Sequence, residues 1–183
     1  MKDKIQSILK EVQIVLSKVN DSEVDNLISE ILNSNRIVVC GAGRVGMAIR
    51  GFGMRLGHLG LNAYTLGDST VPGIAENDLL IVASGSGETQ TIFDLVAIAS
   101  KNKCRIVAVT GNPDSRIGKL ANVIVKITAP SKTKPVEGFV SVQPMTTLNE
   151  QCLGLFFDAV SLKLMDKMGE NHETMWARHS NLE

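Results

Sequence analysis

Residues 78–97 (DLLIVASGSGETQTIFDLVA) constrain the fold more than any other stretch of the chain. The apolar run 79–82 is long enough for one buried strand, and apolar residues return within 92–96 at the spacing of a helix face. The turn 84–89 is therefore predicted to join the carboxyl end of a strand to the amino end of a helix. A helix amino end carries free backbone N–H groups and the positive end of the helix dipole, so this turn is expected to bind an anion.

The residue types of this turn favour a phosphate site, which we name the cradle. Its two glycines let the backbone approach a ligand closely, and its hydroxyl side chains add donors without adding charge. The alternative is that Ser86 or Thr89 only caps the helix. Glu88 is acidic within an anion site, so its side chain is expected to point outward and to interact favourably with the helix dipole. The cradle residues predicted to bind a substrate are Ser84, Gly85, Ser86, Gly87, Glu88 and Thr89.

The same alternation of apolar runs and helical patterns extends over the rest of the chain. Continuous apolar strands alternating with helices imply a parallel sheet covered on both faces. The expected fold is therefore α/β, a three-layer, doubly wound, five-stranded parallel sheet of flavodoxin-like order 2-1-3-4-5. No linker or repeat divides the chain, so a single domain over 1–183 is expected. The predicted strands are 36–40, 62–65, 79–83, 105–109 and 123–127.

The two ends of the chain stand apart from this alternation. Two amphipathic helices are predicted first, one over 3–19 and one from about residue 21, and they cover either their own sheet or a partner subunit. Residues 128–146 are predicted to form a long loop, which inside a compact domain is usually functional. A long helix is expected over about 147–168. The polar tail 169–183 is expected to be ordered over a crevice of a partner subunit, although polar chain ends are usually disordered unless tied down.

Composition argues against several classes of function. The 19 Lys and Arg residues balance 19 Asp and Glu residues, and this zero net charge gives no support for nucleic acid or an anionic membrane as a partner. No apolar run reaches the length of a membrane span, and the first residues do not form a signal peptide. Cys40, Cys104 and Cys152 are widely spaced without a CxxC pair. They are predicted to be buried thiols in a reducing cytoplasm, with no disulfide and no metal site.

A second glycine-rich turn follows the first predicted strand. In the order 2-1-3-4-5 the sheet reverses direction between its first and third strands, so this turn and the cradle are expected to line one crevice. The motif Gly41-x-Gly43-x-x-Gly46 also matches a dinucleotide-binding pattern, and Asp68 follows the second strand, where a ribose-binding acid would lie. Dinucleotide binding does not require the cradle, however, and a dehydrogenase would also need a substrate domain. This alternative is therefore disfavoured.

Three motifs together resemble the sugar isomerase (SIS) fold: RIVVCGAGRVG, LLIVASGSGET and a helix-opening TLNEQ. Within that fold, RLGHLG at 55–60, PMTTLNEQ at 144–151 and RHSNLE at 178–183 resemble the 6-phospho-3-hexuloisomerase family. The resemblance covers nearly the whole chain. It implies a homotetrameric enzyme, without metal or cofactor, that interconverts D-arabino-hex-3-ulose 6-phosphate and D-fructose 6-phosphate. That reaction belongs to the ribulose monophosphate pathway of formaldehyde fixation. A sugar-phosphate sensor that binds without catalysis remains the alternative.

The resemblance also implies roles for single residues. Glu150 becomes the base that moves the proton, although spacing alone favours a Thr147–Glu150 capping box at the start of the last long helix. His179 lies in a tail that resembles the family's active-site tail, which reaches a neighbouring subunit, and it is expected to be the partner acid. His58 is the second choice for that role, while His172 is expected to be solvated.

The first glycine turn is expected to add substrate contacts through Gly43, Arg44 and Val45. Arg44 is either a surface charge or a contact to phosphate or substrate hydroxyls. Two positions depart from the family pattern. Val45 replaces a serine that is frequent there, which removes one hydroxyl but leaves the backbone N–H. Thr147 and Asn149 stand where a glycine and an apolar residue are common, so the detailed shape of the site is expected to differ.

Overall fold

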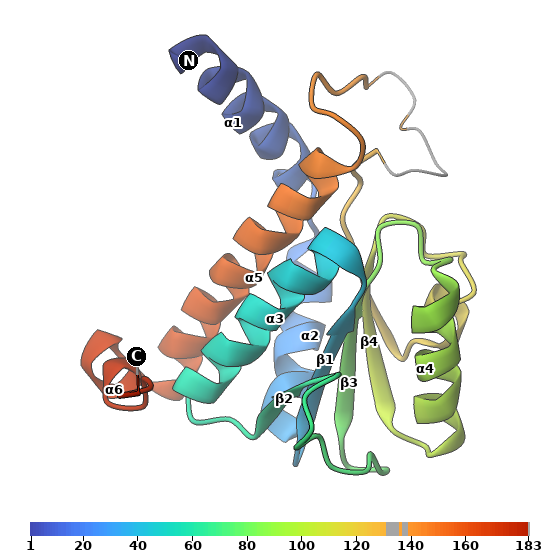
Figure 1. Cartoon of the computed structure of the whole chain (residues 1–183), viewed down its shortest axis with the longest axis vertical. Coiled ribbons are helices and arrows are strands. Elements are labelled where there is room, and N and C mark those ends of the chain that lie inside the picture. Colours follow the sequence, from blue (N-terminus) through green and yellow to red (C-terminus); the bar gives the residue numbers. More distant parts are fainter. Residues whose placement is uncertain (131–135, 137–138, 183) are drawn as a thin grey trace.

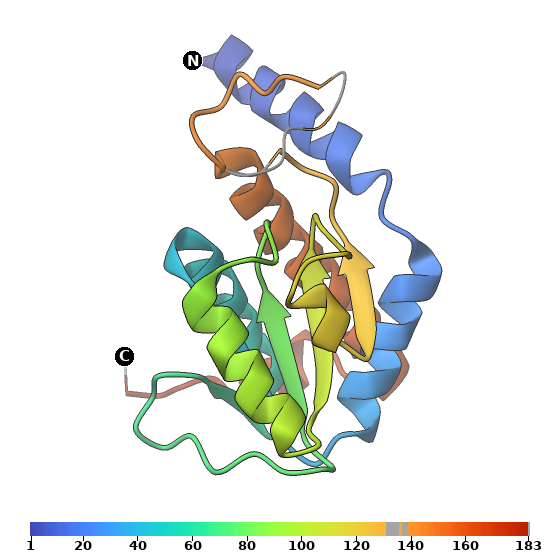
Figure 2. The same ribbon diagram turned by 90° about the vertical axis from the view of Figure 1, so that its right-hand side faces the viewer.

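The computed structural model describes residues 1–130, 136 and 139–182. Its centre is a five-stranded parallel sheet with strand order β2-β1-β3-β4-β5 (Figures 1 and 2). This topology confirms the predicted doubly wound sheet, with its reversal between β1 and β3. The strands are β1 (Ile37–Gly41), β2 (Ala63–Thr65), β3 (Leu79–Ala83), β4 (Arg105–Thr110) and β5 (Val123–Lys126).

Most helices lie where the sequence predicted them, with differences at their ends. The first helix ends three residues earlier than expected, and the side chain of Asn20 caps the second. Residues 118–120 form a short 3₁₀ turn. The helices are α1 (Lys2–Leu16), α2 (Asp21–Asn33), α3 (Gly43–His58), α4 (Gln90–Lys101), the 3₁₀ turn η1 (Gly118–Leu120), α5 (Thr147–Met168) and α6 (His172–Trp176).

Helices cover both faces of the sheet, because successive strand residues point to opposite sides. Figure 1 shows α4 on one side and α2, α3 and α5 on the other. Val38 and Leu80 pack toward α4 and η1, whereas Val39 and Ile81 pack toward α2, α3 and α5. Every residue of β3 is buried, as expected for a central strand covered twice.

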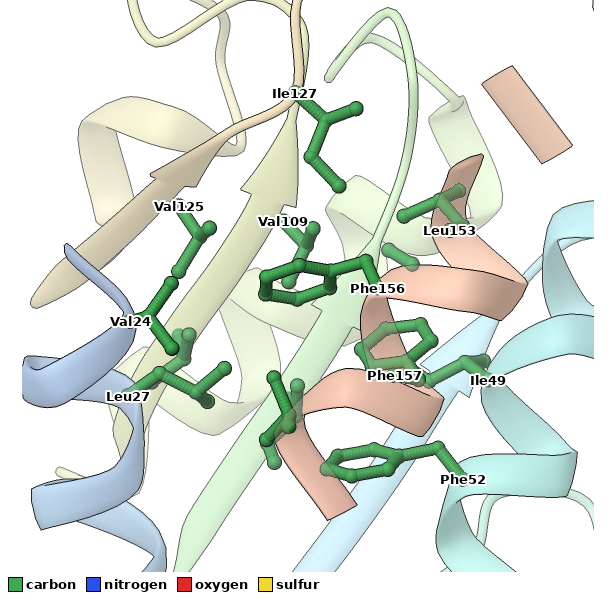
Figure 3. Close-up of a cluster of buried hydrophobic side chains, with 14 of the residues drawn as sticks. Val24, Leu27, Ile49, Phe52, Val109, Val125, Ile127, Leu153, Phe156 and Phe157 are labelled. Atoms are coloured by element: carbon green, nitrogen blue, oxygen red, sulfur yellow. The ribbon is translucent and has the colours of Figure 1, made fainter. Parts of the chain in front are cut away.

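The larger of the two cores holds α5 firmly against α3 (Figure 3). Phe157 of α5 stacks on Phe52 of α3, with ring centroids 4.6 Å apart, and Phe156 packs beside it. All three phenylalanines are buried. Burial of side chains this large contributes about 1.5–3 kcal/mol each, so α3 and α5 behave as one rigid pair.

The two N-terminal helices differ in what they cover. Helix α2 packs on β4 and β5, whereas α1 packs on α5 and its amino end projects away from the domain (Figure 1). Val12 and Val15 of α1 are buried, but Ile5 and Leu9 are about half exposed. Packing on the chain's own sheet therefore describes α2 and not α1. Among the described residues, no helix is both long and apolar enough to cross a membrane.

Candidate functional site

Two helices begin side by side at the carboxyl ends of the two central strands. The strands β1 and β3 are paired along their whole length, and α3 and α4 follow them directly. Neither helix has a side-chain cap: Ala42 offers no polar group, and Thr89 makes no cap hydrogen bond. The alternative that Thr89 caps α4 is therefore wrong. Two uncapped helix ends thus direct their positive dipole ends and free N–H groups toward one crevice, which suits an anion.

The first glycine turn supplies backbone donors to this crevice. The intrahelical bonds of α3 begin with the N–H of Gly46, which donates to Ala42 O at 3.0 Å. The N–H groups of Gly43, Arg44 and Val45 consequently have no partner within the helix. The side chain of Val45 packs against the core. Its departure from the family pattern therefore costs a hydroxyl and leaves the N–H in place.

The cradle hydroxyls are oriented by the cradle's own backbone. Ser84 Oγ accepts a hydrogen bond from Gly87 N–H at 3.1 Å, and Ser86 Oγ accepts one from Glu88 N–H at 3.2 Å. Ser84 Oγ also lies 3.2 Å from Thr89 Oγ1. Because a hydroxyl that accepts can still donate, the Ser86 O–H remains able to bind a phosphate oxygen. Ser86 is bonded to the turn and does not cap α4, so that alternative is wrong as well.

The segment after β4 packs against the cradle. Gly87 adopts a left-handed backbone (φ +66°), and a Cβ there would lie 1.9 Å from the Oγ of buried Ser115. Glu88 turns away from the crevice, as expected, and accepts hydrogen bonds from the backbone N–H and Nε of Arg116 at 3.0 and 2.7 Å. These bonds hold the pKa of the Glu88 carboxyl below its ordinary value. The Glu88 carboxylate is therefore paired with the Arg116 guanidinium outside the crevice.

Glu150 lies in the first turn of α5 and is only 13% exposed. Its Oε1 accepts a hydrogen bond from Thr146 Oγ1 at 2.8 Å. Its Oε2 lies 3.2 Å from Arg44 Nε, without hydrogen-bond geometry. Thr146 is the N-cap of α5 and makes no side-chain cap bond, so the alternative of a Thr147–Glu150 capping box is wrong. Arg44 was expected to be either a surface charge or a contact to the substrate. Its guanidinium lies between Glu150 and Thr147 Oγ1.

Three oxygens around the start of α5 are buried without a hydrogen-bond donor among the described residues. They are Gln143 Oε1, Glu150 Oε2 and Gln151 Oε1. Each buried acceptor left unpaired costs about 1–3 kcal/mol. Donors from outside the chain, such as sugar hydroxyls, would recover that cost. Glu150 Oε2 also keeps a lone pair that can take a proton.

Asn149 connects the first turn of α5 to the cradle. It is almost fully buried, and a Cβ added to Gly85 would lie 2.8 Å from its Nδ2. Only glycine therefore fits at position 85 while Asn149 occupies this place. Asn149, which departs from the family pattern, thus contacts the cradle directly. Glu150 is the next residue along the chain.

A cavity of about 400 Å³ is lined by residues of α3, α5 and α6. It lies toward the carboxyl ends of α3 and α5, where Figure 1 shows α6. Imidazole and indole rings line it in a row: Trp176 stacks on His179 at 4.9 Å between centroids, and His179 lies 5.2 Å from His58. His172, which was expected to be solvated, stacks on Trp176 at 6.1 Å. Arg55 Nη1 lies 3.2 Å from His58 Nδ1, and because a guanidinium only donates, this ring nitrogen accepts.

Ion pairing ties the tail to this cavity. Arg178 donates to the carbonyl oxygen of His58 at 3.0 Å and pairs with Glu170 at 2.8 Å. Hydrogen bonds from Arg178 and Thr174 hold the pKa of the Glu170 carboxyl at about 2. The described part of the tail, 169–182, therefore packs over a cavity whose walls, α3 and α5, belong to its own chain. That it covers a partner's crevice stays a prediction.

The predicted site residues form two groups within one chain. The structure brings together the cradle, the first turn of α3 and Glu150, and it separately brings together His58 and His179. Arg44 and His58 are separated by most of the length of α3, which corresponds to about 21 Å at 1.5 Å per residue. The two groups therefore do not meet within a single copy.

Sequence reasoning did not anticipate the neighbours that orient these groups. Thr146, which donates a hydrogen bond to Glu150, lies one residue before the expected helix. Because Thr147 is adjacent and of the same type, the sequence did not indicate which of the two threonines contacts Glu150. Arg116, which neutralises Glu88, lies 28 residues further along in an irregular segment. Asn149 did carry a signal, since it was already visible as a departure from the family pattern.

Comparisons with known proteins agree with this geometry. A family model described as "SIS domain" matches residues 30–153. The chain is 41% identical over 179 residues to the 3-hexulose-6-phosphate isomerase of Bacillus subtilis (strain 168), covering 98% of this chain and 97% of that protein. It is 40% identical to the protein of the same name from Mycobacterium gastri, covering 94% and 86%.

A solved structure from Methanococcus jannaschii shares the whole fold. Its TM-score is 0.86 at 27% identity, and the match covers 99% of both chains. That structure is described as a hypothetical protein for which a molecular function of 3-hexulose-6-phosphate isomerase is inferred.

Proposed function

This chain belongs to the SIS domain family, and we propose that it is an isomerase that interconverts D-arabino-hex-3-ulose 6-phosphate and D-fructose 6-phosphate. The observation that carries the proposal is the position of Glu150. A largely buried carboxylate, one oxygen of which accepts no hydrogen bond, lies one residue from Asn149, which packs against the uncapped, hydroxyl-rich cradle. An anchor for the phosphate and a base within one crevice are what a phosphosugar isomerase needs.

In this mechanism the cradle fixes the C6 phosphate while Glu150 moves a proton between neighbouring carbons. Starting from the 3-ulose, Glu150 takes the proton from C2, and the electrons form a C2=C3 double bond as O3 gains a proton. The resulting cis-enediol loses its O2 proton, and the proton held by Glu150 returns at C3. Atoms and charge balance without any external acceptor of electrons. Arg44 lies beside the carboxylate and is placed to bind substrate oxygens.

Transfer of the proton between O2 and O3, and opening of cyclic fructose 6-phosphate, require a second acid–base group. His179 is the first candidate and His58 the second, because both line the cavity beside α6. His58 lies about 21 Å along α3 from Arg44, the residue beside Glu150, so a second copy of the chain must bring its histidines to the crevice. We therefore propose a homo-oligomer, specifically a tetramer, with each crevice shared by two copies. The buried free thiols of Cys40, Cys104 and Cys152 fit a cytoplasmic location.

Solvent deuterium exchange tests the proposed reaction. The wild-type protein should incorporate deuterium from D₂O into fructose 6-phosphate and convert the 3-ulose, whereas a sensor would bind and exchange nothing. Glu150→Gln preserves the side-chain shape and removes basicity. It should lower both turnover and exchange by about 10²–10⁴-fold, the usual effect of a lost general base. Affinity for fructose 6-phosphate should change little, since the cradle is untouched.

Glu30→Gln is the matched control. Glu30 is also a half-buried glutamate paired with an arginine, Arg105, but it lies at the opposite edge of the sheet. This variant should retain wild-type exchange. Wild-type exchange by Glu150→Gln would remove Glu150 as the base, and binding without exchange by the wild-type protein would leave only the sensor function.

A further inference from the structure

Glu11 is a buried carboxylate outside the crevice that the proposed mechanism does not use. It lies on α1, is 8% exposed, and accepts three hydrogen bonds from a single short segment. Val142 N–H donates to Oε1 at 2.7 Å, while Ser141 Oγ and Gln143 Nε2 donate to Oε2 at 2.8 and 2.9 Å. Ser141 Oγ in turn accepts from Gln143 N–H at 3.0 Å. One side chain therefore fixes residues 141–143.

All three donors to Glu11 are neutral, and no cationic side chain among the described residues pairs with it. Burial works to raise the pKa of Glu11, but the bonds from Val142, Gln143 and Ser141 together hold that pKa below its ordinary value. The group is thus a carboxylate that accepts on both oxygens. An amide in its place would present an NH₂ group to at least one donor, so glutamine cannot reproduce the network.

The segment that Glu11 holds leads directly into the base. Met145 adopts a left-handed backbone (φ +55°), which a non-glycine residue adopts only when its neighbours hold it there. Thr146 then donates to Glu150. Burial raises the pKa of the Cys152 thiol to about 12, and the charge of Glu11 raises it as well, so Glu11 lies near the first turns of α5. Chain path and contacts therefore connect Glu11 to the first turn of α5.

We propose that Glu11 is a positioning residue for catalysis: by anchoring residues 141–143 to α1, it sets the position of Thr146 and hence aims the Glu150 carboxylate at the substrate. The inference rests on the proposed function, since it needs Glu150 to be the base. It also gives α1, which does not lie on the sheet, a role in the active site.

The Glu11→Gln variant tests this inference in a steady-state assay of the full chain. Misplacing a catalytic group by about 1 Å can cost roughly 10²-fold in rate, so kcat should fall by about 10–100-fold. KM and fructose 6-phosphate affinity should stay near wild type, because the cradle is held by the segment after β4. A residue that only stabilised the fold would not split kcat from KM in this way.

Glu23→Gln is the control for loss of a comparable tie. Glu23 on α2 accepts a hydrogen bond from Lys126 N–H at 2.8 Å, which also joins an N-terminal helix to a later segment, but at the sheet edge. Glu23→Gln should retain wild-type kcat. If Glu11→Gln does not fold, Ser141→Ala, which removes one donor and keeps the carboxylate, should lower kcat in the same direction by a smaller factor.

A double-variant cycle identifies the route of the effect. In a Glu150→Gln background, adding Glu11→Gln should lower the residual turnover no further, because the group that it aims is already absent. Equal kcat in the Glu11→Gln and Glu23→Gln variants, or fully additive losses with Glu150→Gln, would overturn the inference. Absence of conversion by the wild-type protein is a separate result, which would overturn the proposed function and the inference with it.

Discussion

Gly87→Ala should damage the cradle more than any other single added methyl group within it. The new Cβ would lie 1.9 Å from Ser115 Oγ and 2.5 Å from Ser115 Cβ, well inside contact distance. The left-handed backbone at position 87 adds about 1–2 kcal/mol for a non-glycine residue. Ser115 cannot rotate away without losing the bond from Gly118 N–H, worth about 0.5–1.5 kcal/mol.

The sum is roughly 1.5–3.5 kcal/mol, and for a domain of this length about 2–4 °C of Tm accompanies each kcal/mol. Thermal unfolding should therefore show a fall of roughly 3–14 °C, and titration with fructose 6-phosphate should show weakened binding because the turn must move. Gly51→Ala is the control: nothing lies within 4 Å of a Cβ there, on α3, so the same change should raise stability by about 0.5–1 kcal/mol.

Ser115→Gly then separates the clash from the backbone strain. In the Gly87→Ala background it removes both clashing atoms, so the double variant should be more stable than the sum of the single losses predicts. A Gly87→Ala protein that melts and binds as wild type does would refute the reasoning, since the close contact with Ser115 would then not exist in solution.

Two further predictions concern the tail and the shared crevice. The folded pKa of Glu170, about 2, lies below its ordinary value of 4.5, so the pair with Arg178 stabilises the tail fully above pH 4.5 and is lost as pH falls toward 2; fluorescence of Trp176, the chain's one tryptophan, should change between pH 4.5 and 2 as the tail is released. The Glu150→Gln and His179→Ala proteins should each be inactive alone. When they are unfolded and refolded together, activity should return to about a quarter of the wild-type value, because about one crevice in four then combines both intact residues; no recovery would contradict the shared crevice.

The topology was predictable because its determinants are local. The runs at β1 and β3 are apolar at every position, and each ends at a glycine turn, which leaves a parallel sheet as the consistent arrangement. The strand–turn–helix arrangement of residues 79–101 was predictable for the same reason, and phosphate binding by its turn stays a prediction. Both features are decided by residues that are neighbours in the sequence.

Features that depend on contacts between distant segments were not predictable. Spacing favoured a capping box for Glu150, but Arg44, more than 100 residues earlier, and Thr146 engage the carboxylate instead. The bonds from 141–143 to Glu11 span about 130 residues. No periodicity encodes such pairs, because a polar side chain on a helix looks equally suited to solvent until the facing segment is known.

The proposal that two copies share each crevice follows from the geometry of α3. Its amino end, with Arg44, belongs to the anion crevice, and its carboxyl end, with His58, belongs to the histidine cavity about 21 Å away. A twofold contact that places the histidine end of one copy over the crevice of its partner necessarily places the partner's over the first. In the proposed oligomer, one such contact would therefore complete two crevices. The proposed tetramer would consist of two such pairs, and the packing of α3 on α5 keeps the two ends of each copy apart.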